Sequence, residues 1–489
     1  MRTHTTRPVS LAVAAIAALL TLHCSMNPAT GERELSLVSE SQEIATGRDA
    51  DPQIVAQFGL YPDESVQRYV ADLGARLAAR SERPDLPWTF RVLDDPLVNA
   101  FALPGGYIYL TRGILAHLES EAELVGVLGH EIGHVTARHS ASQMSKSLLA
   151  QIGLIAGAIA APEAAQDYGG LAQQLAGLLF LKYGRDDERQ ADRLSVRYSV
   201  AAGFDPNAML GVFETLERVS QATDGSRLPG WASTHPSPEN RTRLIAEVID
   251  EAGVQRQGLE VDRASYLQRL EGMTYGSNPR EGFFRGGTFY HPELEFQLAF
   301  PNGWPRQNSR QFVAAISPGQ NAVIELRLAQ EDSLAAAEQS FFGQQGVRAG
   351  QEGPNRINGL QARTREFAVV DTAGRASIVG RAAFVEHQGR VFRLLGYQRP
   401  EVGHASELTR TLESFAVLRD RSLLNVEPMT LRVVRAERSA PFSQQPAIRR
   451  SSLDIERLAL INRAEPGATI PGGALIKTVE GSDYSSPAS

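Results

Sequence analysis

Residues 124–134 of the chain read Leu-Val-Gly-Val-Leu-Gly-His-Glu-Ile-Gly-His, and this stretch decides the fold that we expect. It contains the pattern H-E-x-x-H over His130–His134, inside a run whose apolar residues recur at helical spacing. At about 100° per residue, His130 and His134 lie about 40° apart on the helix surface. Two imidazoles one turn apart can bind a single tetrahedral metal ion. The sequence therefore predicts a helix that carries a metal site.

Other residues of this helix indicate its surroundings. Glu131 falls near the apolar face, where partial desolvation raises the basicity of a carboxylate, so Glu131 is the candidate catalytic base. Gly126, Gly129 and Gly133 gather on the opposite face, and each costs about 1 kcal/mol relative to alanine inside a helix. We therefore expect a second helix to approach closely on the glycine face.

A zinc site of this type needs a third protein ligand and an open fourth position for water. The helical stretch Asp186–Asp192 contains four carboxylates. Spacing alone permits Asp187, Glu188 or Asp192 as the ligand. Glu188 and Asp192 share a helix face, so one could bind the metal while the other orients a ligand histidine. The alternative is a solvated charged face.

The N-terminus predicts export. The apolar run Leu11–Leu20 follows basic residues and is too short to span a bilayer, so residues 1–23 are expected to be a signal peptide. Cys24 comes next and resembles the lipidated cysteine of bacterial outer-membrane lipoproteins. Thr21 and His23 depart from that pattern, and a plain secretory signal is the alternative.

Composition excludes several classes of protein. The 489 residues are 42% hydrophobic and 21% charged, which is typical of soluble globular domains. With 49 basic and 56 acidic residues the net charge is −7, so the chain lacks the bulk positive charge of a nucleic-acid-binding protein and we expect no such partner. The single cysteine excludes an intrachain disulfide framework and a cysteine-based zinc cage.

Pattern changes along the chain divide it into parts. The first expected domain covers residues 24–275. Residues 50–275 are mostly helical, with a predicted strand at Trp88–Leu93 and a hairpin over Asn99–Leu110. The fourteen apolar residues Leu148–Ala161 predict a buried or surface-docking helix, because they are too few to span a membrane. The remaining expected parts are a linker at 276–287, an α+β accessory domain at 288–420 and a short segment at 428–480.

Several motifs, in order, resemble the HtpX and CAAX-prenyl-endopeptidase type of zinc metallopeptidase, especially its periplasmic branch. The resemblance covers roughly residues 24–270. It depends on these stretches: Cys24-x-x-Asn27-Pro28-Ala29-Thr30-Gly31, Asn99–Gly106, His130–His134 followed by Arg138-His139, Glu188-x-x-x-Asp192, and Thr234-His235-Pro236 with Arg241 beyond.

The resemblance implies a mainly α-helical, zincin-like (gluzincin) domain with a small β-sheet and one Zn²⁺ per subunit. It implies Glu188 as the third ligand beside His130 and His134, Asp192 as the carboxylate that orients a ligand, and Glu131 as the base that activates water. It places His235 on a segment that can cover the metal. His235 could act as a gate, stabilise an oxyanion or only pack in a loop.

Three further expectations complete the interpretation. The strand with Tyr107, Ile108 and Tyr109 could pair with an extended substrate, although an ordinary core hairpin is equally consistent with it. His139 is expected to be structural, because an imidazole five residues beyond His134 points elsewhere on a continuous helix. The segment at 428–480 resembles half of a peptidoglycan-binding LysM module, and a plain structural appendage is the alternative.

The function that we expect is a zinc endopeptidase of the bacterial cell envelope, facing the periplasm and anchored to the outer membrane through Cys24. The family implies quality control, with unfolded or misassembled envelope proteins as substrates. The alternatives are a chaperone-like adaptor with a silenced peptidase site and a peptidoglycan-associated factor.

Overall fold

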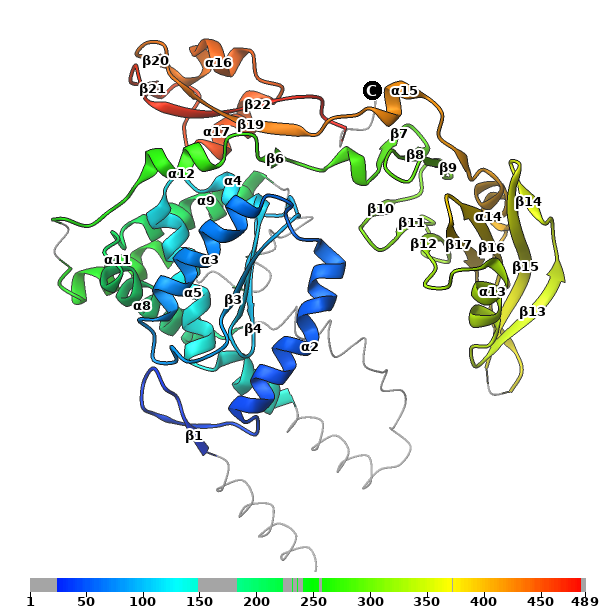
Figure 1. Cartoon of the computed structure of the whole chain (residues 1–489), viewed down its shortest axis with the longest axis horizontal. Coiled ribbons are helices and arrows are strands. Elements are labelled where there is room, and N and C mark those ends of the chain that lie inside the picture. The colour runs from blue at the N-terminus through cyan, green and yellow to red at the C-terminus, as the bar shows by residue number, and fades with distance from the viewer. Residues whose placement is uncertain are drawn as a thin grey trace, which may run out of the picture. The chain divides into compact units, whose positions relative to one another are not determined.

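The computed structural model describes residues 24–147, 183–222, 231, 235, 241–254, 257–371 and 373–484. They form two compact units, the first from the residues up to Met273 with Leu431–Val479, the second from Thr274–Thr430 and the residues from Glu480 onward (Figure 1). The predicted signal peptide and the apolar stretch Leu148–Ala161 lie outside the described residues. No helix among the described residues is long and apolar enough to cross a membrane.

The first unit combines helices with a small sheet. Its helices are α2 (Glu40–Phe58), α3 (Glu64–Ala78), α4 (Arg112–His117), α5 (Glu121–Thr136), α8 (Arg185–Ala201), α9 (Ala208–Ala222), α11 (Arg241–Glu251) and α12 (Arg263–Arg269). Its first strands are β1 (Cys24–Met26) and β2 (Arg33–Leu35), which pair with each other, and β3 (Thr89–Leu93), β4 (Ala100–Leu103) and β5 (Tyr107–Thr111).

Helix α5, which carries the H-E-x-x-H pattern, is the centre of the first unit. The Ser120 side chain caps its N-terminus by accepting a hydrogen bond from the Glu123 amide. All residues from 122 to 136 are buried, so the helix is covered on every side. A Cβ on Gly129 or Gly133 would lie 3.1 Å from atoms of α8, and one on Gly126 would collide with Met209 of α9. The predicted close approach on the glycine face is thus confirmed.

The predicted hairpin at residues 99–110 is present, but its second strand lies in the middle of the sheet. The strand order is β3-β5-β4, with β5 parallel to β3 and antiparallel to β4. Gly105 and Gly106 form the turn with φ of 82° and 100°, which side chains disfavour. Because both edges of β5 are hydrogen-bonded, Tyr107, Ile108 and Tyr109 have no free edge for a substrate. The expectation of substrate pairing on this strand is wrong.

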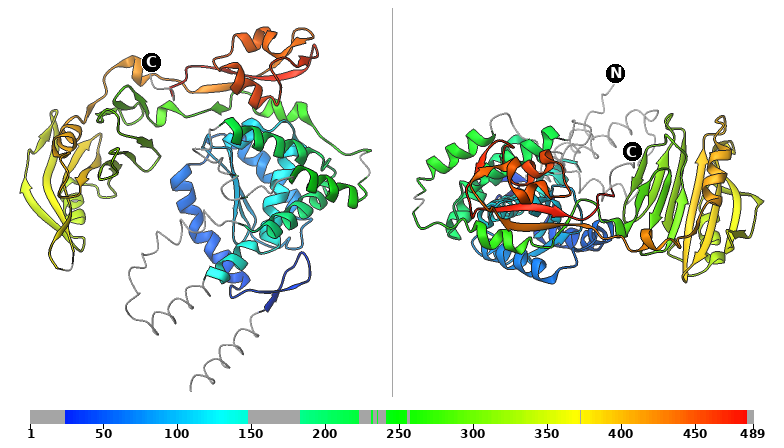
Figure 2. Two further views of the ribbon diagram at one scale, coloured as in Figure 1. Left: turned by 180° about the vertical axis from the view of Figure 1, so that it is seen from behind. Right: turned by 90° about the horizontal axis from the view of Figure 1, so that it is seen from above.

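The second unit is built on antiparallel sheets. Its larger sheet has the order β10-β11-β12-β17-β16-β15-β13, with β14 beside β15, and its smaller sheet has the order β18-β9-β8-β7 (Figure 2). The strands are β7 (Phe283–Arg285), β8 (Thr288–His291), β9 (Phe296–Ala299), β10 (Arg306–Asn308), β11 (Val313–Ile316), β12 (Ala322–Leu328), β13 (Val347–Glu352), β14 (Arg356–Ile357), β15 (Leu360–Val370), β16 (Ala376–His387), β17 (Arg390–Gln398) and β18 (Ala416–Val417).

Two helices cover opposite faces of the larger sheet. Helix α13 (Leu334–Phe342) packs against Phe384, whereas α14 (Ala405–Glu413) packs against the core that contains Ala383. Neighbouring residues of a strand point to opposite faces. A short helix, α15 (Arg421–Leu424), follows. Residues 276–287, expected as a linker, contain the 3₁₀ helix η2 (Pro279–Glu281) and strand β7, so this unit begins earlier than the sequence pattern indicated.

The C-terminal segment belongs to the first unit. It contains β19 (Met429–Arg435), β20 (Ala440–Pro441), η3 (Phe442–Gln444), α16 (Pro446–Arg449), α17 (Ile455–Ile461), β21 (Thr469–Ile470) and β22 (Leu475–Glu480). Strand β19 lies between β22 and β6 (Thr274–Tyr275).

A group of charged side chains, all buried except Arg263 and the partly buried Arg463, joins this segment to the start of α5. We call it the clamp cluster: Glu119, Glu123, Arg263, Arg463 and Lys477. Lys477 Nζ lies 3.0 Å from Glu119 Oε1 and donates hydrogen bonds to the carbonyls of Ala116 and Leu118. Arg463 lies 2.6 Å from Glu123, and Arg263 pairs with Glu119. The segment therefore completes the packing of the first unit.

Candidate metal centre

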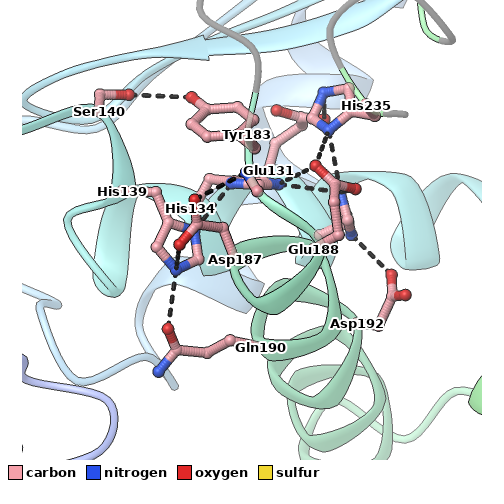
Figure 3. Close-up of polar contacts among 12 residues, drawn as sticks. Glu131, His134, His139, Ser140, Tyr183, Asp187, Glu188, Gln190, Asp192 and His235 are labelled. Atoms are coloured by element: carbon pink, nitrogen blue, oxygen red, sulfur yellow. Dashed lines mark hydrogen bonds and ion pairs between the residues drawn. The ribbon is translucent and has the colours of Figure 1, made fainter. Parts of the chain in front are cut away.

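Four buried side chains bring their metal-binding atoms together beside α5. We call them the metal-donor cluster: His130 and His134 from α5, Glu188 from α8, and His235. Figure 3 labels the last three of these side chains. One ligand atom from each lies within 4.8 Å of all the others. The structure thus gathers the predicted residues from three separate parts of the chain.

The spacing of these atoms fits a tetrahedral metal ion. The His130 and His134 Nε2 atoms are 3.0 Å apart, and Glu188 oxygens lie 3.5 and 3.6 Å from them. Ligand atoms about 2.0–2.1 Å from one tetrahedral centre lie about 3.3–3.4 Å from each other. Two imidazoles and one carboxylate also form the donor set of known catalytic zinc sites. The residues present therefore fit a zinc ion.

Glu131 faces the same space without a hydrogen-bonding partner among the described residues. Its side chain is fully buried, and neither carboxylate oxygen accepts a hydrogen bond. The Nε2 atom of His235 lies 3.5 Å from the Oε1 atom of Glu131. Burial raises the pKa of Glu131. A buried carboxylate with both oxygens unsatisfied is costly unless another group, such as a water molecule, completes it.

Asp192 and Arg241 contact the predicted ligands His130 and Glu188 and fix their orientation. Asp192 Oδ1 lies 2.9 Å from His130 Nδ1, which leaves Nε2 of that ring facing the cluster. Arg241 donates to both oxygens of Asp192, and its Nη2 lies 2.9 Å from Glu188 Oε2. Burial lowers the pKa of His130, but its hydrogen bonds to Asp192 and Glu188 outweigh burial and raise the pKa to about 9. Burial raises the pKa of Asp192, but Arg241 keeps it below its usual range.

His134 has neighbours for which the sequence analysis predicted no role at the site. The Tyr183 ring stacks on it at 3.9 Å between ring centres, and the Tyr183 hydroxyl lies 2.9 Å from Ser140 Oγ. His139, expected to point away, has its Nδ1 2.9 Å from Nδ1 of His134. That expectation is wrong because α5 ends at Thr136 and the chain turns at Arg138, whose φ is 60°.

His235, the fourth member of the metal-donor cluster, lies close to the other three. Its Nδ1 is 2.9 Å from Glu188 Oε1 and 3.4 Å from His130 Nε2, so it reaches the position that a fourth ligand would take. The Trp231 ring stacks on His235 at 4.5 Å, and the Trp231 amide donates to the carbonyl of Val98, just before β4. Arg241 belonged to a motif seen in the sequence, whereas nothing in the sequence singled out Trp231, Tyr183 or Gln190.

The chain resembles known proteins across the part that builds this centre. The model of peptidase family M48 matches residues 64–249. The mitochondrial metalloendopeptidase OMA1 of Schizosaccharomyces pombe is 32% identical over 48% of this chain and 69% of its own length. The β-barrel assembly-enhancing protease of Escherichia coli K12 is 31% identical over 44% of this chain and 45% of its own length.

A third relative is matched almost completely. Metalloprotease YcaL of Escherichia coli K12 is 29% identical over 49% of this chain and 96% of its own length. By contrast, the chain spans only 38 to 52% of the β-barrel assembly-enhancing proteases that it matches. The matched residues include the whole metal-donor cluster, and the chain therefore belongs to peptidase family M48.

Proposed function

We propose that this protein is a zinc-dependent endopeptidase. The observation that carries the proposal is the buried group of His130, His134 and Glu188 beside the unpartnered carboxylate of Glu131. Zinc bound there would supply Lewis acidity, which lowers the pKa of a bound water and polarises a carbonyl group. Two imidazoles and one carboxylate would hold it, as in other zinc peptidases.

The protein's own residues supply the proton transfers. The Glu131 carboxylate accepts a proton from the attacking water and passes it to the leaving amine. Its buried position raises its pKa, which makes it a stronger base than an exposed carboxylate. Asp192 holds the His130 ring by its Nδ1 atom, and Arg241 fixes Asp192 in turn.

We place the substrate backbone along β4 instead of β5. Strand β4 packs against α5, and among the described residues no strand pairs with its outer edge. An extended peptide can add to such an edge through main-chain hydrogen bonds. The carbonyl of Val98, which accepts from the Trp231 amide, lies at the entrance to this edge.

Replacing Glu131 by glutamine tests the proposal. The variant should keep its zinc, because no ligand is lost, and should cleave an unstructured protein such as casein at least ~10²-fold more slowly. Glu121→Gln is the matched control, because Glu121 lies on the same helix and hydrogen-bonds Tyr69 away from the site. Undiminished cleavage by Glu131→Gln would refute the role of this carboxylate.

We further propose that His235 gates the site by taking the fourth ligand position at rest. Its Nδ1 contacts to Glu188 and His130 support this role over an oxyanion role. His235→Ala should then raise the turnover of casein, because water and substrate no longer compete with the imidazole. A lower turnover with unchanged zinc content and melting temperature would instead favour oxyanion stabilisation.

We propose the cell envelope as the place of action. Two observations support this location: the bacterial relatives are named β-barrel assembly-enhancing proteases, and the sequence predicts a signal peptide. Unfolded or misassembled envelope proteins are then the substrates, with Cys24 as the lipid anchor to the outer membrane. Peptidoglycan binding by residues 428–480 stays a weaker proposal, because Lys477 and Arg463 of this segment are engaged in the clamp cluster.

A further inference from the structure

We propose that His139 is a positioning residue for His134, and that Gln190 fixes the proton arrangement through which it acts. The inference depends on the proposed metal site, because its consequence is the orientation of a zinc ligand. His139 is 1% exposed and lies at the edge of the metal-donor cluster without belonging to it. Figure 3 shows the line of contacts from His134 through His139 to Gln190.

Hydrogen-bond chemistry determines which nitrogen of His139 and which nitrogen of His134 carries the proton. His139 Nε2 lies 2.7 Å from Gln190 Oε1, and an amide oxygen only accepts, so Nε2 carries the proton. A neutral imidazole has one protonated nitrogen, so Nδ1 of His139 is an acceptor. Nδ1 of His134, 2.9 Å away, must then be the donor. This leaves the lone pair of His134 on Nε2, the atom that faces His130 and Glu188.

The side chain of Gln190 is held with its amide oxygen toward His139. It lies on α8, between Glu188 and Asp192, so one helix supplies a ligand and both outer supports. The Asn27 amide group also points to Gln190 Oε1, at 3.5 Å. The Ala29 amide donates to Asn27 Oδ1, so the Asn27 group that faces Gln190 is the NH2 donor, and the Gln190 atom that it faces is the oxygen. Asp187 is the nearest carboxylate to His139, with Oδ1 3.9 Å from Nε2.

The backbone is strained at the point that brings His139 back to His134. Arg138 has a φ of 60°, in the left-handed region that a residue with a side chain rarely adopts. Its guanidinium pairs with the buried carboxylate of Glu43 and donates to the carbonyl of Val38 at 2.7 Å. Such strain persists only where surrounding contacts enforce it, and it concentrates at functional sites.

The two ligand histidines therefore have different supports. His130 donates from Nδ1 to a carboxylate, Asp192, whereas His134 donates from Nδ1 to a neutral imidazole. Partners of this kind typically contribute 10–100-fold to metal affinity. The expected consequence of losing His139 is weaker zinc binding, with the ligands themselves intact.

The test measures zinc affinity by competition with a chromogenic chelator, together with the melting temperature of the metal-free protein. His139→Phe keeps the ring but removes the acceptor, and should weaken zinc binding by about 10–100-fold. His139→Asn can offer its amide oxygen where Nδ1 lies and should recover most of the affinity. Ser195→Ala is the control, since it removes another buried hydrogen bond between α8 and α5 and should leave zinc affinity unchanged.

The possible results distinguish the proposed role of His139 from the proposed function. Wild-type affinity in a folded His139→Phe protein, or equal weakening in His139→Asn and His139→Phe, would overturn the inference and leave the proposed function intact. A wild-type protein that takes up no zinc would overturn both. If His139→Phe does not fold, Gln190→Met decides, because it removes the oxygen that fixes the His139 proton. Zinc affinity unchanged by Gln190→Met would then refute the line of contacts.

Discussion

Two groups of mostly buried charged side chains lie along α5, and they differ in how completely they are paired. In the clamp cluster, at the start of the helix, Lys477, Arg263 and Arg463 each lie within 3.0 Å of a carboxylate oxygen. In the metal-donor cluster, further along the helix, the Nε2 atoms of His130 and His134 lie 3.0 Å apart. Beside them, neither oxygen of Glu131 accepts a hydrogen bond from any residue that the structure describes.

This difference indicates a structural role for the clamp cluster and a functional role for the metal-donor cluster. A buried ionic group in which every charge has an opposite charge beside it can persist as part of a fold, even though it adds little to stability. Buried polar atoms that lack partners require another explanation, and a site completed by a metal ion and water is one. Burial and charge alone therefore do not mark a catalytic centre, because both clusters have them.

The largest expected effect tests the identity of the metal-donor cluster. Glu188→Ala should lose zinc and reduce casein cleavage at least ~10²-fold, because a zinc site of this type needs three protein ligands. A chelator should lower the melting temperature of the wild type but not that of the variant, since bound metal stabilises only a protein that holds it.

Asp186→Ala is the control for this experiment, because Asp186 lies on the same helix with 90% of its side chain exposed. It should keep both zinc and activity. If Glu188→Ala retains zinc while Asp187→Ala or Asp192→Ala loses it, the third ligand is misassigned.

An intermediate effect is expected from the clamp cluster, on stability instead of metal. Lys477→Met leaves the buried carboxylate of Glu119 with Arg263 as its remaining partner, and should lower the free energy of unfolding by about 3 kcal/mol. Zinc stoichiometry of the folded protein should not change. Denaturant unfolding and metal analysis on the same samples check both statements.

Two further variants sharpen that result. Adding Glu119→Gln to Lys477→Met removes the carboxylate as well as the ammonium group. Water can then solvate Arg263, whose side chain is 40% exposed, so the double variant should recover part of the lost stability. Arg457→Met breaks an exposed ion pair with Asp454 and should cost less than about 1 kcal/mol. Loss of zinc in Lys477→Met at full folding would mean that the two clusters are not separable.

The smallest effect is expected from removing the second unit. Tyr275 and Met429 are paired antiparallel neighbours, so replacing residues 276–428 by Asn-Gly should close a two-residue hairpin. The shortened protein keeps both clusters and should bind zinc and cleave a short unstructured peptide at nearly the wild-type rate. A fragment ending at residue 275 lacks Lys477 and Arg463 and should be much less stable. Equal stability of the two would contradict the structural role of the clamp cluster.

Local patterns were sufficient for most elements. The helix at α5 and the hairpin of β4 and β5 agree with predictions from periodicity and turn residues, and the second unit has the mixture of helices and strands expected for residues 288–420. The glycines of α5 even predicted the approach of α8, because a glycine inside a helix is costly unless something needs the space.

Predictions failed where residues distant in sequence meet. Whether β5 lies at the edge of its sheet depends on β3, which precedes the hairpin and pairs with its far strand. Residues 276–287 have the composition of a linker because glycine, proline, serine and arginine cluster there, yet pairing with β8 makes residues 283–285 a strand. Lys477 gave no local signal, since its partner Glu119 lies 358 positions earlier in the chain.

Residue types and helical spacing were enough to predict the chemistry of the centre: the pair of imidazoles one helical turn apart, the adjacent Glu131, and a short set of carboxylates for the third position. Those features depend on helix geometry alone, which is the same in every protein. The contact between His139 and His134 could not be predicted in this way, because it depends on residues far apart in the chain. The left-handed backbone of Arg138, held by Glu43 about 95 positions away, returns His139 to His134, and no local periodicity records such a contact.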